Sequence, residues 1–253
     1  MTNTIIEIEE TDKSDAMVPL LSHQFGSWRF RLDRHALPTG QILTKYDRAA
    51  STWHAMMQRL GYPAAYRQAL RTMFAACPLR SVDPAPAVLD CGTGSGTLSL
   101  AFARVWAAPF TLVATDTSAH MLDQARQRFE QTGIAASTRH SDVRHLPFAN
   151  NSFDIVMAAH LLEHLQDPDA ALAEMVRVTR PGGVIILCLT RRSLPGFYIH
   201  MTWRTRLYTA QDVRALISAT GLQDLCLPRL SWLHPLRHFS IACICRKPLD
   251  TVE

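Results

Sequence analysis

Residues 88–98 read VLDCGTGSGTL, and this stretch decides the fold. Its apolar start is followed by three alternate glycines, Gly92, Gly94 and Gly96, before a helical pattern begins at Leu98. Glycine has no Cβ atom, so the backbone can turn sharply there and approach a ligand, while the first N–H groups of the following helix are free to bind it. A strand, a glycine turn and a helix in this order predict the first unit of a parallel α/β sheet.

Short apolar runs and helical patterns alternate after this unit. The runs predicted as strands are 87–91, 111–115, 137–141, 153–158, 184–189, 222–227 and 240–245. Helix start signals lie between them, because Asp167-Pro168 offers an N-cap followed by proline and residues 209–212 form a capping-box pattern. This alternation predicts βαβ units with helices packed on a mostly parallel sheet.

The chain before the predicted sheet divides into two segments. Residues 1–20 are polar and acidic, and we expect a flexible tail there. Within residues 21–80, apolar residues recur at helical spacing at 53–60 and at 66–74, which predicts two amphipathic helices in an N-terminal helical cap. Residues 81–249 then form the predicted α/β domain.

The composition is that of an ordinary globular protein. Of the 253 residues, 47% are hydrophobic and 19% are charged, which is enough apolar chain for a sizeable core. No run approaches the ~18 apolar residues of a membrane span, and the N-terminus lacks a signal-peptide pattern, so we expect a cytoplasmic protein. The net charge of +4 combines −4 in the first 20 residues with +8 in the rest. A basic body is compatible with an anionic substrate, RNA or a membrane surface.

No metal centre is predicted. The six cysteines lack the CxxC spacing of metal sites, which favours buried free thiols, and Cys243 and Cys245 should share one face of a strand. Residues 160–164 match H-x-x-E-H, which in a long helix binds zinc. Here the pattern directly follows a buried run and precedes Asp167-Pro168, so the helix is too short for that reading.

The glycine spacing and one acidic residue indicate the kind of ligand. The spacing is G-x-G-x-G, and Thr97 stands where the G-x-G-x-x-G pattern of nicotinamide dehydrogenases needs its last glycine. Asp116 closes the second predicted strand, where a carboxylate can accept hydrogen bonds from both hydroxyls of a ribose. The pattern therefore favours a ribose-containing ligand other than a nicotinamide cofactor.

Further blocks, in order, resemble the class I S-adenosylmethionine (SAM)-dependent methyltransferases, especially the ubiquinone/menaquinone-biosynthesis-type group of small-molecule enzymes. The resemblance covers about residues 46 to 246. Its blocks are Tyr46-Asp47, Val88 to Gly96, Asp116 with Met121-Leu122, Ser141 to Val143, Leu146 to Phe148, Asn151 to Val156, Leu162 to Leu165, Glu174 to Arg177 and Arg180 to Gly183. It implies a Rossmann-like, seven-stranded sheet in the order 3-2-1-4-5-7-6, with the seventh strand antiparallel and helices on both faces.

The resemblance also implies roles at a SAM site. The glycines would approach the methionine part and the ribose, Asp116 would hold the ribose hydroxyls, and Asp142 with Val143 would read the adenine. The full set that the resemblance places at the cofactor is Tyr46, Asp90, Gly92, Thr93, Gly94, Gly96, Asp116, Thr117, Met121, Asp142, Val143, Ala159 and His160.

The implied reaction is methyl transfer from SAM to an O, N or C atom of a small molecule, with S-adenosylhomocysteine as product. The methyl carbon is already activated by the sulfonium, so the protein mainly aligns the reactants and a general base is optional. If the acceptor must lose a proton, His160, His164 and His200 are the candidate bases.

The acceptor is less determined. Enzymes that methylate the amino groups of DNA bases carry an Asp/Asn-Pro-Pro-Tyr/Phe motif after the fourth strand. Residues 158–161 read AAHL at that place, so DNA is not expected to be the substrate. Residues 191–206 carry four arginines among aromatic residues and form either a lid over an anionic or aromatic substrate, a membrane contact, or a segment packed on the core. An RNA-directed enzyme and a non-catalytic SAM-binding protein are the alternatives, and no oligomeric state is indicated.

Overall fold

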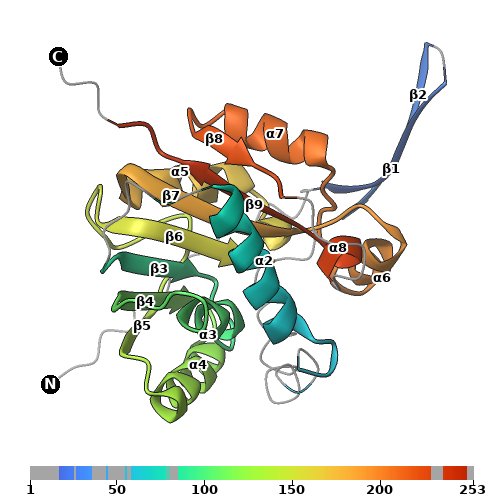
Figure 1. The fold of residues 1–253 in the computed structure, drawn as a ribbon. Coiled ribbons are helices and arrows are strands. Elements are labelled where there is room, and N and C mark those ends of the chain that lie inside the picture. Colours follow the sequence, from blue (N-terminus) through green and yellow to red (C-terminus); the bar gives the residue numbers. More distant parts are fainter. Residues whose placement is uncertain are drawn as a thin grey trace, which may run out of the picture.

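The computed structural model describes residues 17–25, 27–35, 44, 55, 58–77, 79, 85–228 and 236–249. Tyr46, which the resemblance places at the cofactor, and most of the first predicted helix lie outside these residues. The fold is shown in Figure 1.

A single seven-stranded sheet organises the domain. In spatial order its strands are β5 (Ala136–His140), β4 (Thr111–Asp116), β3 (Ala87–Cys91), β6 (Phe153–Ala159), β7 (Thr179–Thr190), β9 (Ser240–Arg246) and β8 (Gln223–Cys226). Numbered along the chain within the sheet, this is the order 3-2-1-4-5-7-6. The strand β9 runs antiparallel to both neighbours and the other pairs are parallel. The predicted fold class is therefore confirmed.

The predicted strands agree with the observed ones except at their ends. The largest difference is in β7, which begins at Thr179 and not at Val184, because Thr179 pairs with Phe153 of β6 before a shift in register. The side chain of Asp167 caps helix α5 (Pro168–Val178) by accepting a hydrogen bond from the Ala170 N–H, as predicted. Thr209 and Asp212 form the predicted capping box of α7 (Ala210–Ser218).

Helices cover both faces of the sheet and build a hydrophobic core on each. Successive residues of a strand point to opposite faces. Val88 of β3 therefore packs with α2 (Tyr62–Ala76), α3 (Thr97–Ala103) and α4 (Ala119–Thr132), and α2 crosses in front of the sheet in Figure 1. Leu89 packs with α5 and α7 on the other face. Cys243 and Cys245 are free thiols that share this second face, as expected.

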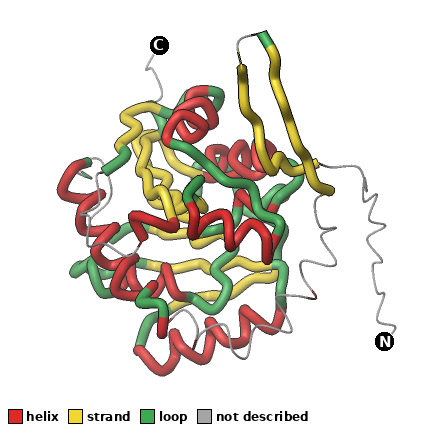
Figure 2. The backbone as a smooth tube through the Cα atoms, turned by 90° about the vertical axis from the view of Figure 1, so that its right-hand side faces the viewer, coloured by secondary structure: helices red, strands yellow, loops and turns green. Residues whose placement is uncertain are grey.

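The N-terminal region contains a hairpin that the sequence analysis did not predict. Strands β1 (Met17–Phe25) and β2 (Trp28–His35) pair antiparallel, although residues 17–20 were assigned to the tail and the rest to a helical cap. The hairpin projects from the body of the molecule in both Figure 1 and Figure 2. In β2, apolar and charged residues alternate after a Gly26-Ser27 pair, which is a hairpin signal. The prediction of a helical cap rested on helical spacing alone and did not use this signal.

Of the two predicted N-terminal helices, α2 is confirmed. Its residues Tyr66, Leu70 and Met73 are buried, as their spacing indicated. The boundaries at residues 20 and 80 stay predictions. Within the described ranges, no helix combines the length and the apolarity needed to cross a bilayer.

Candidate cofactor and acceptor site

The glycine turn after β3 uses its three glycines for different purposes. All three have positive φ, at 62° for Gly92, 52° for Gly94 and 81° for Gly96. A Cβ atom on Gly92 would lie 2.7 Å from the Leu161 side chain, and one on Gly96 would lie 2.9 Å from the Phe129 ring of α4. No atom lies within 4 Å of a Cβ on Gly94, because that position faces open space. The missing side chains therefore allow close packing at two positions and ligand access at the third.

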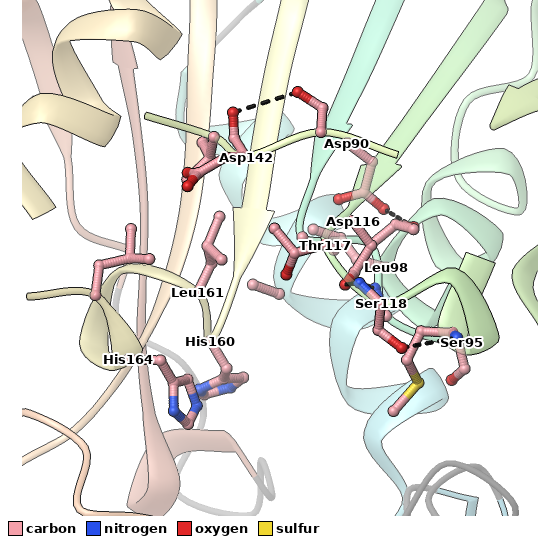
Figure 3. A pocket seen from close by; sticks show the side chains of 18 of the residues that line it. Asp90, Ser95, Leu98, Asp116, Thr117, Ser118, Asp142, His160, Leu161 and His164 are labelled. Carbon is pink, nitrogen blue, oxygen red and sulfur yellow. Dashed lines mark hydrogen bonds between the residues drawn. The ribbon is translucent and has the colours of Figure 1, made fainter. Parts of the chain in front are cut away.

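A pocket lies over the C-terminal ends of the parallel strands (Figure 3). Of the predicted cofactor residues, those lining it are Asp90, Gly92, Thr93, Gly94, Asp116, Thr117, Met121, Asp142, Val143, Ala159 and His160. Gly96 is not among them and packs against the Phe129 ring of α4, so its assignment to the cofactor stays a prediction. The sequence analysis did not assign to the cofactor the other lining residues Tyr66, Ser95, Thr97, Leu98, Ser118, Ser141, Arg144, Leu161, His164, Leu165 and Gln166.

Asp90 is a buried carboxylate at the end of β3. Its Oδ2 accepts hydrogen bonds from the hydroxyls of Thr93, at 2.8 Å, and Ser99. Its Oδ1 is buried and has no hydrogen-bond partner in the described part of the chain. Burial raises the pKa of Asp90 to about 6, although the Ser99 and Thr93 hydroxyls act to lower it. The residue therefore offers one unused acceptor at the pocket and is ionised at neutral pH.

Asp116 is held by the backbone at the end of β4. Its Oδ2 accepts the Gly94 N–H at 2.8 Å and its Oδ1 accepts the Ser118 N–H at 2.9 Å. Each carboxylate oxygen keeps a further lone pair, because an ionised carboxylate has about four acceptor sites. Burial raises the pKa of Asp116, and the backbone N–H groups of Ser118 and Gly94 oppose that rise. Two backbone bonds fix this carboxylate against the glycine turn without exhausting its oxygens.

Asp142 lies in the loop that follows β5, beside the adjacent Arg144. The Arg144 guanidinium forms a two-point ion pair with it, with Nε–Oδ2 at 3.0 Å and NH2–Oδ2 at 2.6 Å. Burial raises the pKa of Asp142, but the hydrogen bonds from Arg144 outweigh burial and hold the pKa below its usual value. Asp142 is therefore a carboxylate near neutral pH, and Arg144 engages both of its oxygens.

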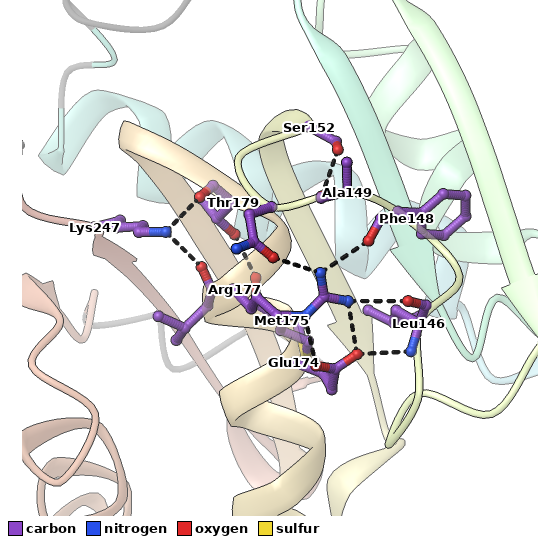
Figure 4. A network of polar contacts seen from close by, with 11 residues as sticks. Leu146, Phe148, Ala149, Ser152, Glu174, Met175, Arg177, Thr179 and Lys247 are labelled. Carbon is purple, nitrogen blue, oxygen red and sulfur yellow. Dashed lines mark hydrogen bonds and ion pairs between the residues drawn. The ribbon is translucent and has the colours of Figure 1, made fainter.

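A polar network on α5 fixes the loop that carries Asp142 (Figure 4). Glu174 accepts the Leu146 N–H at 2.8 Å and pairs with Arg177 at 2.6 Å. Arg177 in turn donates to the carbonyl oxygens of Leu146 and Phe148 at 2.9 and 2.8 Å. The hydrogen bond from Arg177 lowers the pKa of Glu174, so the pair stays charged. The family block from Glu174 to Arg177 thus positions a pocket loop without touching the pocket.

His160 stands on the opposite side of the pocket with its ring held by protein partners. Its Nδ1 lies 2.9 Å from Glu163 Oε1, and its Nε2 lies 3.0 Å from the Ser240 hydroxyl of β9. The backbone of His160 is left-handed, with φ at 54°, and its N–H donates to the Cys188 carbonyl of β7. Both ring nitrogens therefore have protein partners, which fix the orientation of the ring at the pocket wall.

Glu163 is the centre of this second cluster. Besides His160, its Oε1 accepts the N–H of Thr190 at 3.0 Å and the Thr190 hydroxyl at 2.6 Å. Burial raises the pKa of Glu163, but the His160 hydrogen bond and the nearby histidines bring it below its usual value. Leu162–His164 form a single 3-10 turn, η1, so the long helix that the H-x-x-E-H zinc reading needs is not present. No described group of three or more acidic, histidine or cysteine side chains is arranged to hold a metal.

The other two candidate histidines occupy different environments. His164 lines the pocket, and burial lowers its pKa to about 4, so it is a weak base. His200 is buried outside the lining set, where its Nδ1 meets the Thr205 carbonyl oxygen within helix α6 (Leu194–Trp203) and the turn after it. The structure therefore brings His160 and His164 to one wall and leaves His200 in a packing position.

Comparison with known proteins shows what the pocket region is similar to. Residues 89–187, which include the glycine turn, Asp116, Asp142 and η1, match a family model described as a methyltransferase domain. The matched region includes the three pocket carboxylates and ends within β7.

Curated proteins with a similar sequence are methyltransferases by name. The chain is 37% identical over 111 residues to the ubiquinone/menaquinone biosynthesis C-methyltransferase UbiE of Bdellovibrio bacteriovorus, covering 44% of this chain and 47% of that protein. It is 38% identical over 107 residues to the protein of that name from Ralstonia pickettii, covering 42% and 44%. The chain thus spans less than half the length of these relatives.

Two solved structures share the fold. A methyltransferase from Haloferax volcanii, solved with the Trm112 methyltransferase activator, superposes with a TM-score of 0.64 at 18% identity, over 80% of this chain and 97% of that one. A SAM-dependent methyltransferase from Thermotoga maritima gives a TM-score of 0.61 at 16% identity, over 81% and 99%. At these identities the likeness is one of fold.

Proposed function

We propose that this chain transfers a methyl group from SAM to a small-molecule acceptor and releases S-adenosylhomocysteine. The observation that carries the proposal is the Asp116 carboxylate, fixed by the Gly94 and Ser118 N–H groups at the end of β4 with acceptor capacity left over. A ribose presents two neighbouring hydroxyl donors, which suit the two oxygens of one carboxylate.

The other residues of the pocket fit the rest of SAM. The unused Asp90 Oδ1 is a buried acceptor for the ammonium group of the methionine part. The loop that carries Asp142 lines the end of the pocket that would take the adenine, and the side chains of Met121, Val143 and Leu161 supply apolar wall for the ring. When bound, SAM supplies a methyl carbon activated by sulfonium. The protein's part is to hold, orient and shield it, since catalysis by alignment needs no covalent step.

We further infer that the acceptor atom is carbon, in a molecule that is already nucleophilic near neutral pH. The name of the UbiE relatives specifies a C-methyltransferase. In this chain, both His160 ring nitrogens have protein partners, and His164 has a pKa of about 4. Because burial lowers the pKa of His164 to about 4, this residue is a poor base for a protonated amine or an alcohol, which must lose a proton before attack, whereas an electron-rich ring needs no such step.

The first experiment is isothermal titration of the protein with S-adenosylhomocysteine, with NADH as the control ligand. Saturable one-to-one binding of S-adenosylhomocysteine alone supports the cofactor assignment, and its absence contradicts it. Label from methyl-labelled SAM is then followed by mass spectrometry into electron-rich aromatic compounds, amines, alcohols and RNA. A new C–C bond supports the carbon assignment. Transfer to RNA, or binding with no transfer to any acceptor, would instead establish an RNA-directed enzyme or a non-catalytic SAM-binding protein.

A further inference from the structure

Helix α6 turns its apolar face toward solvent. Leu194, Phe197, Tyr198 and Met201 are exposed by 89%, 46%, 75% and 48%. They are spaced i, i+3, i+4 and i+7, so they lie on one face of the helix. The opposite face carries Gly196 and His200, which are buried. A surface helix ordinarily presents polar side chains to solvent, so an exposed apolar stripe of this size on α6 is unusual.

The surroundings of this face are cationic. Between Thr190 and Tyr208 the sequence has four arginines and no aspartate or glutamate. Arg191 and Arg192 are both exposed at the start of α6. The Arg191 guanidinium donates to the Arg237 carbonyl oxygen at 3.3 Å, and no carboxylate of the described residues pairs with either arginine. Within the described part of the chain, the charge of these two arginines is therefore not neutralised.

A second helix extends the same surface. The short helix α8 (Leu236–Phe239) packs beside α6, as Figure 1 shows, and the Ser193 hydroxyl donates to the His238 carbonyl oxygen. Arg237 and His238 of α8 are exposed. An apolar strip is thus bordered by cations from two segments that lie far apart in the sequence.

This surface lies next to the pocket. Trp203, at the end of α6, packs edge-on against the ring of His164, with ring centroids 6.5 Å apart. The Arg206 N–H donates to the Glu163 carbonyl oxygen at 2.9 Å. Helix α6 is therefore attached to the pocket wall that carries His160 and His164. Asp116 lies on the opposite side of the pocket.

We propose that the face formed by Leu194, Phe197, Tyr198 and Met201 inserts into the surface of an anionic phospholipid bilayer. Aromatic and aliphatic side chains of an interfacial helix bury among the outer acyl chains, while neighbouring arginines pair with lipid phosphates. Charge complementarity selects this occupant, because an apolar protein partner would need its own carboxylates to match Arg191 and Arg192. Binding in this orientation brings the His160 wall of the pocket close to the bilayer. The proposal does not depend on methyl transfer.

The test is co-sedimentation of the whole chain with vesicles. One set is pure phosphatidylcholine and the other contains about one-third phosphatidylglycerol, a content that gives the surface a negative potential. We expect the protein to pellet with the anionic vesicles and to be released as salt is raised, because ions screen the arginine–phosphate attraction. No pelleting, or equal pelleting with both vesicle types, would overturn the proposal.

Three variants separate the contributions. Arg191→Glu/Arg192→Glu should lower the binding constant at least about 25-fold, since each cation at an anionic surface contributes about fivefold. Phe197→Ser/Tyr198→Ser should lower it about tenfold through lost apolar burial. The matched control is Leu249→Ser, because Leu249 is 69% exposed but lies beyond the other end of β9, and it should bind like the parent.

Titration with S-adenosylhomocysteine distinguishes a misfolded variant from one that has lost only its binding to the bilayer. Each variant should keep the affinity of the parent protein, whatever that value is. A vesicle-binding defect in a variant with parental circular dichroism and thermal unfolding supports the proposal even if the chain binds no S-adenosylhomocysteine. If the α6 variants instead abolish a concentration-dependent dimer and leave vesicle binding intact, the face belongs to a second copy and the membrane proposal is wrong.

Discussion

The two sides of the pocket are built on different principles. On the β3–β4–β5 side, Asp90 and Asp116 stand at strand ends, and their hydrogen bonds leave acceptor capacity at the pocket. On the β6–β7–β9 side, His160 and Glu163 are bonded mainly to each other, to Thr190 and to Ser240. One side thus offers carboxylate acceptors to a ligand, whereas the polar groups of the other mainly bind one another.

The family match includes residues from both sides. It covers residues 89–187, so the carboxylates and also His160 and Glu163 lie inside it, while α6 and Ser240 lie outside. The second side is thus completed by parts of the chain beyond the matched region.

The largest expected effect breaks the carboxylate side directly. Asp116→Ala removes an acceptor for two ribose hydroxyls, so S-adenosylhomocysteine affinity should fall by about 2–3 kcal/mol, or about 30- to 150-fold. Isothermal titration measures it. Asp123→Ala on the exposed face of α4 is the matched control and should bind normally. Parental affinity in a folded Asp116→Ala protein would contradict the cofactor assignment.

The next largest effect concerns the α5 network that holds the loop after β5. Arg177→Met leaves the carbonyl oxygens of Leu146 and Phe148 without their donor, and should cost about 2 kcal/mol in the free energy of unfolding by urea. Arg126→Met, which removes an ion pair more than half exposed on both partners, should cost less than about 1 kcal/mol. Equal losses in the two variants would mean that the α5 network does not hold the loop.

A pH series tests the buried carboxylate of β3. The pKa of Asp90 is raised to about 6, and a ligand ammonium favours its ionised form. Affinity for S-adenosylhomocysteine should therefore be full above pH 6 and fall as pH drops through 6, by about tenfold between pH 7 and pH 5. Titrations at a series of pH values measure this fall. A flat profile over that range, with the protein folded throughout, would remove Asp90 from the site.

The smallest expected effect is that of a substitution on α6, outside the carboxylate side of the pocket. Tyr198→Ser changes an exposed side chain of α6 that is absent from the pocket lining, so its S-adenosylhomocysteine affinity should stay within about twofold of the parent. Titration under the conditions used for Asp116→Ala checks it. A large loss would show that α6 contributes to cofactor binding and that the two sides are not independent.

Local patterns were sufficient for most of the fold. Five of the seven strands from β3 to β9 have a short apolar run, whereas β5 (ASTRH) and β8 (QDLC) are mostly polar. The caps at Asp167 and Thr209 are recognisable because a capping side chain bonds within three residues. The β1–β2 hairpin also left a local signal in the alternation of β2 and in Gly26-Ser27. It was missed because the region was examined for helical spacing, not because the information was absent.

The site was only partly predictable for a different reason. Glycine spacing does not tell whether an absent Cβ faces a ligand, as at Gly94, or a neighbouring helix, as at Gly96. Tyr66 has the signature of an ordinary buried helix residue, yet it also lines the pocket. Three histidines were equivalent as candidates, and only their partners distinguish the pocket residues His160 and His164 from the packed His200.

The sequence by itself determined the order of strands and helices, the glycine turn and the carboxylate at the end of β4, because these depend on residues close together in the chain. The tertiary structure decided which side chains face one another. His160 meets Ser240 across 80 positions of sequence, and Arg177 reaches the Leu146 carbonyl across 31. Such contacts arise when separate elements pack on one sheet, and local periodicity carries no record of them. The outward-facing apolar stripe of α6 belongs to the same class, since periodicity defines a face but not the direction in which it points.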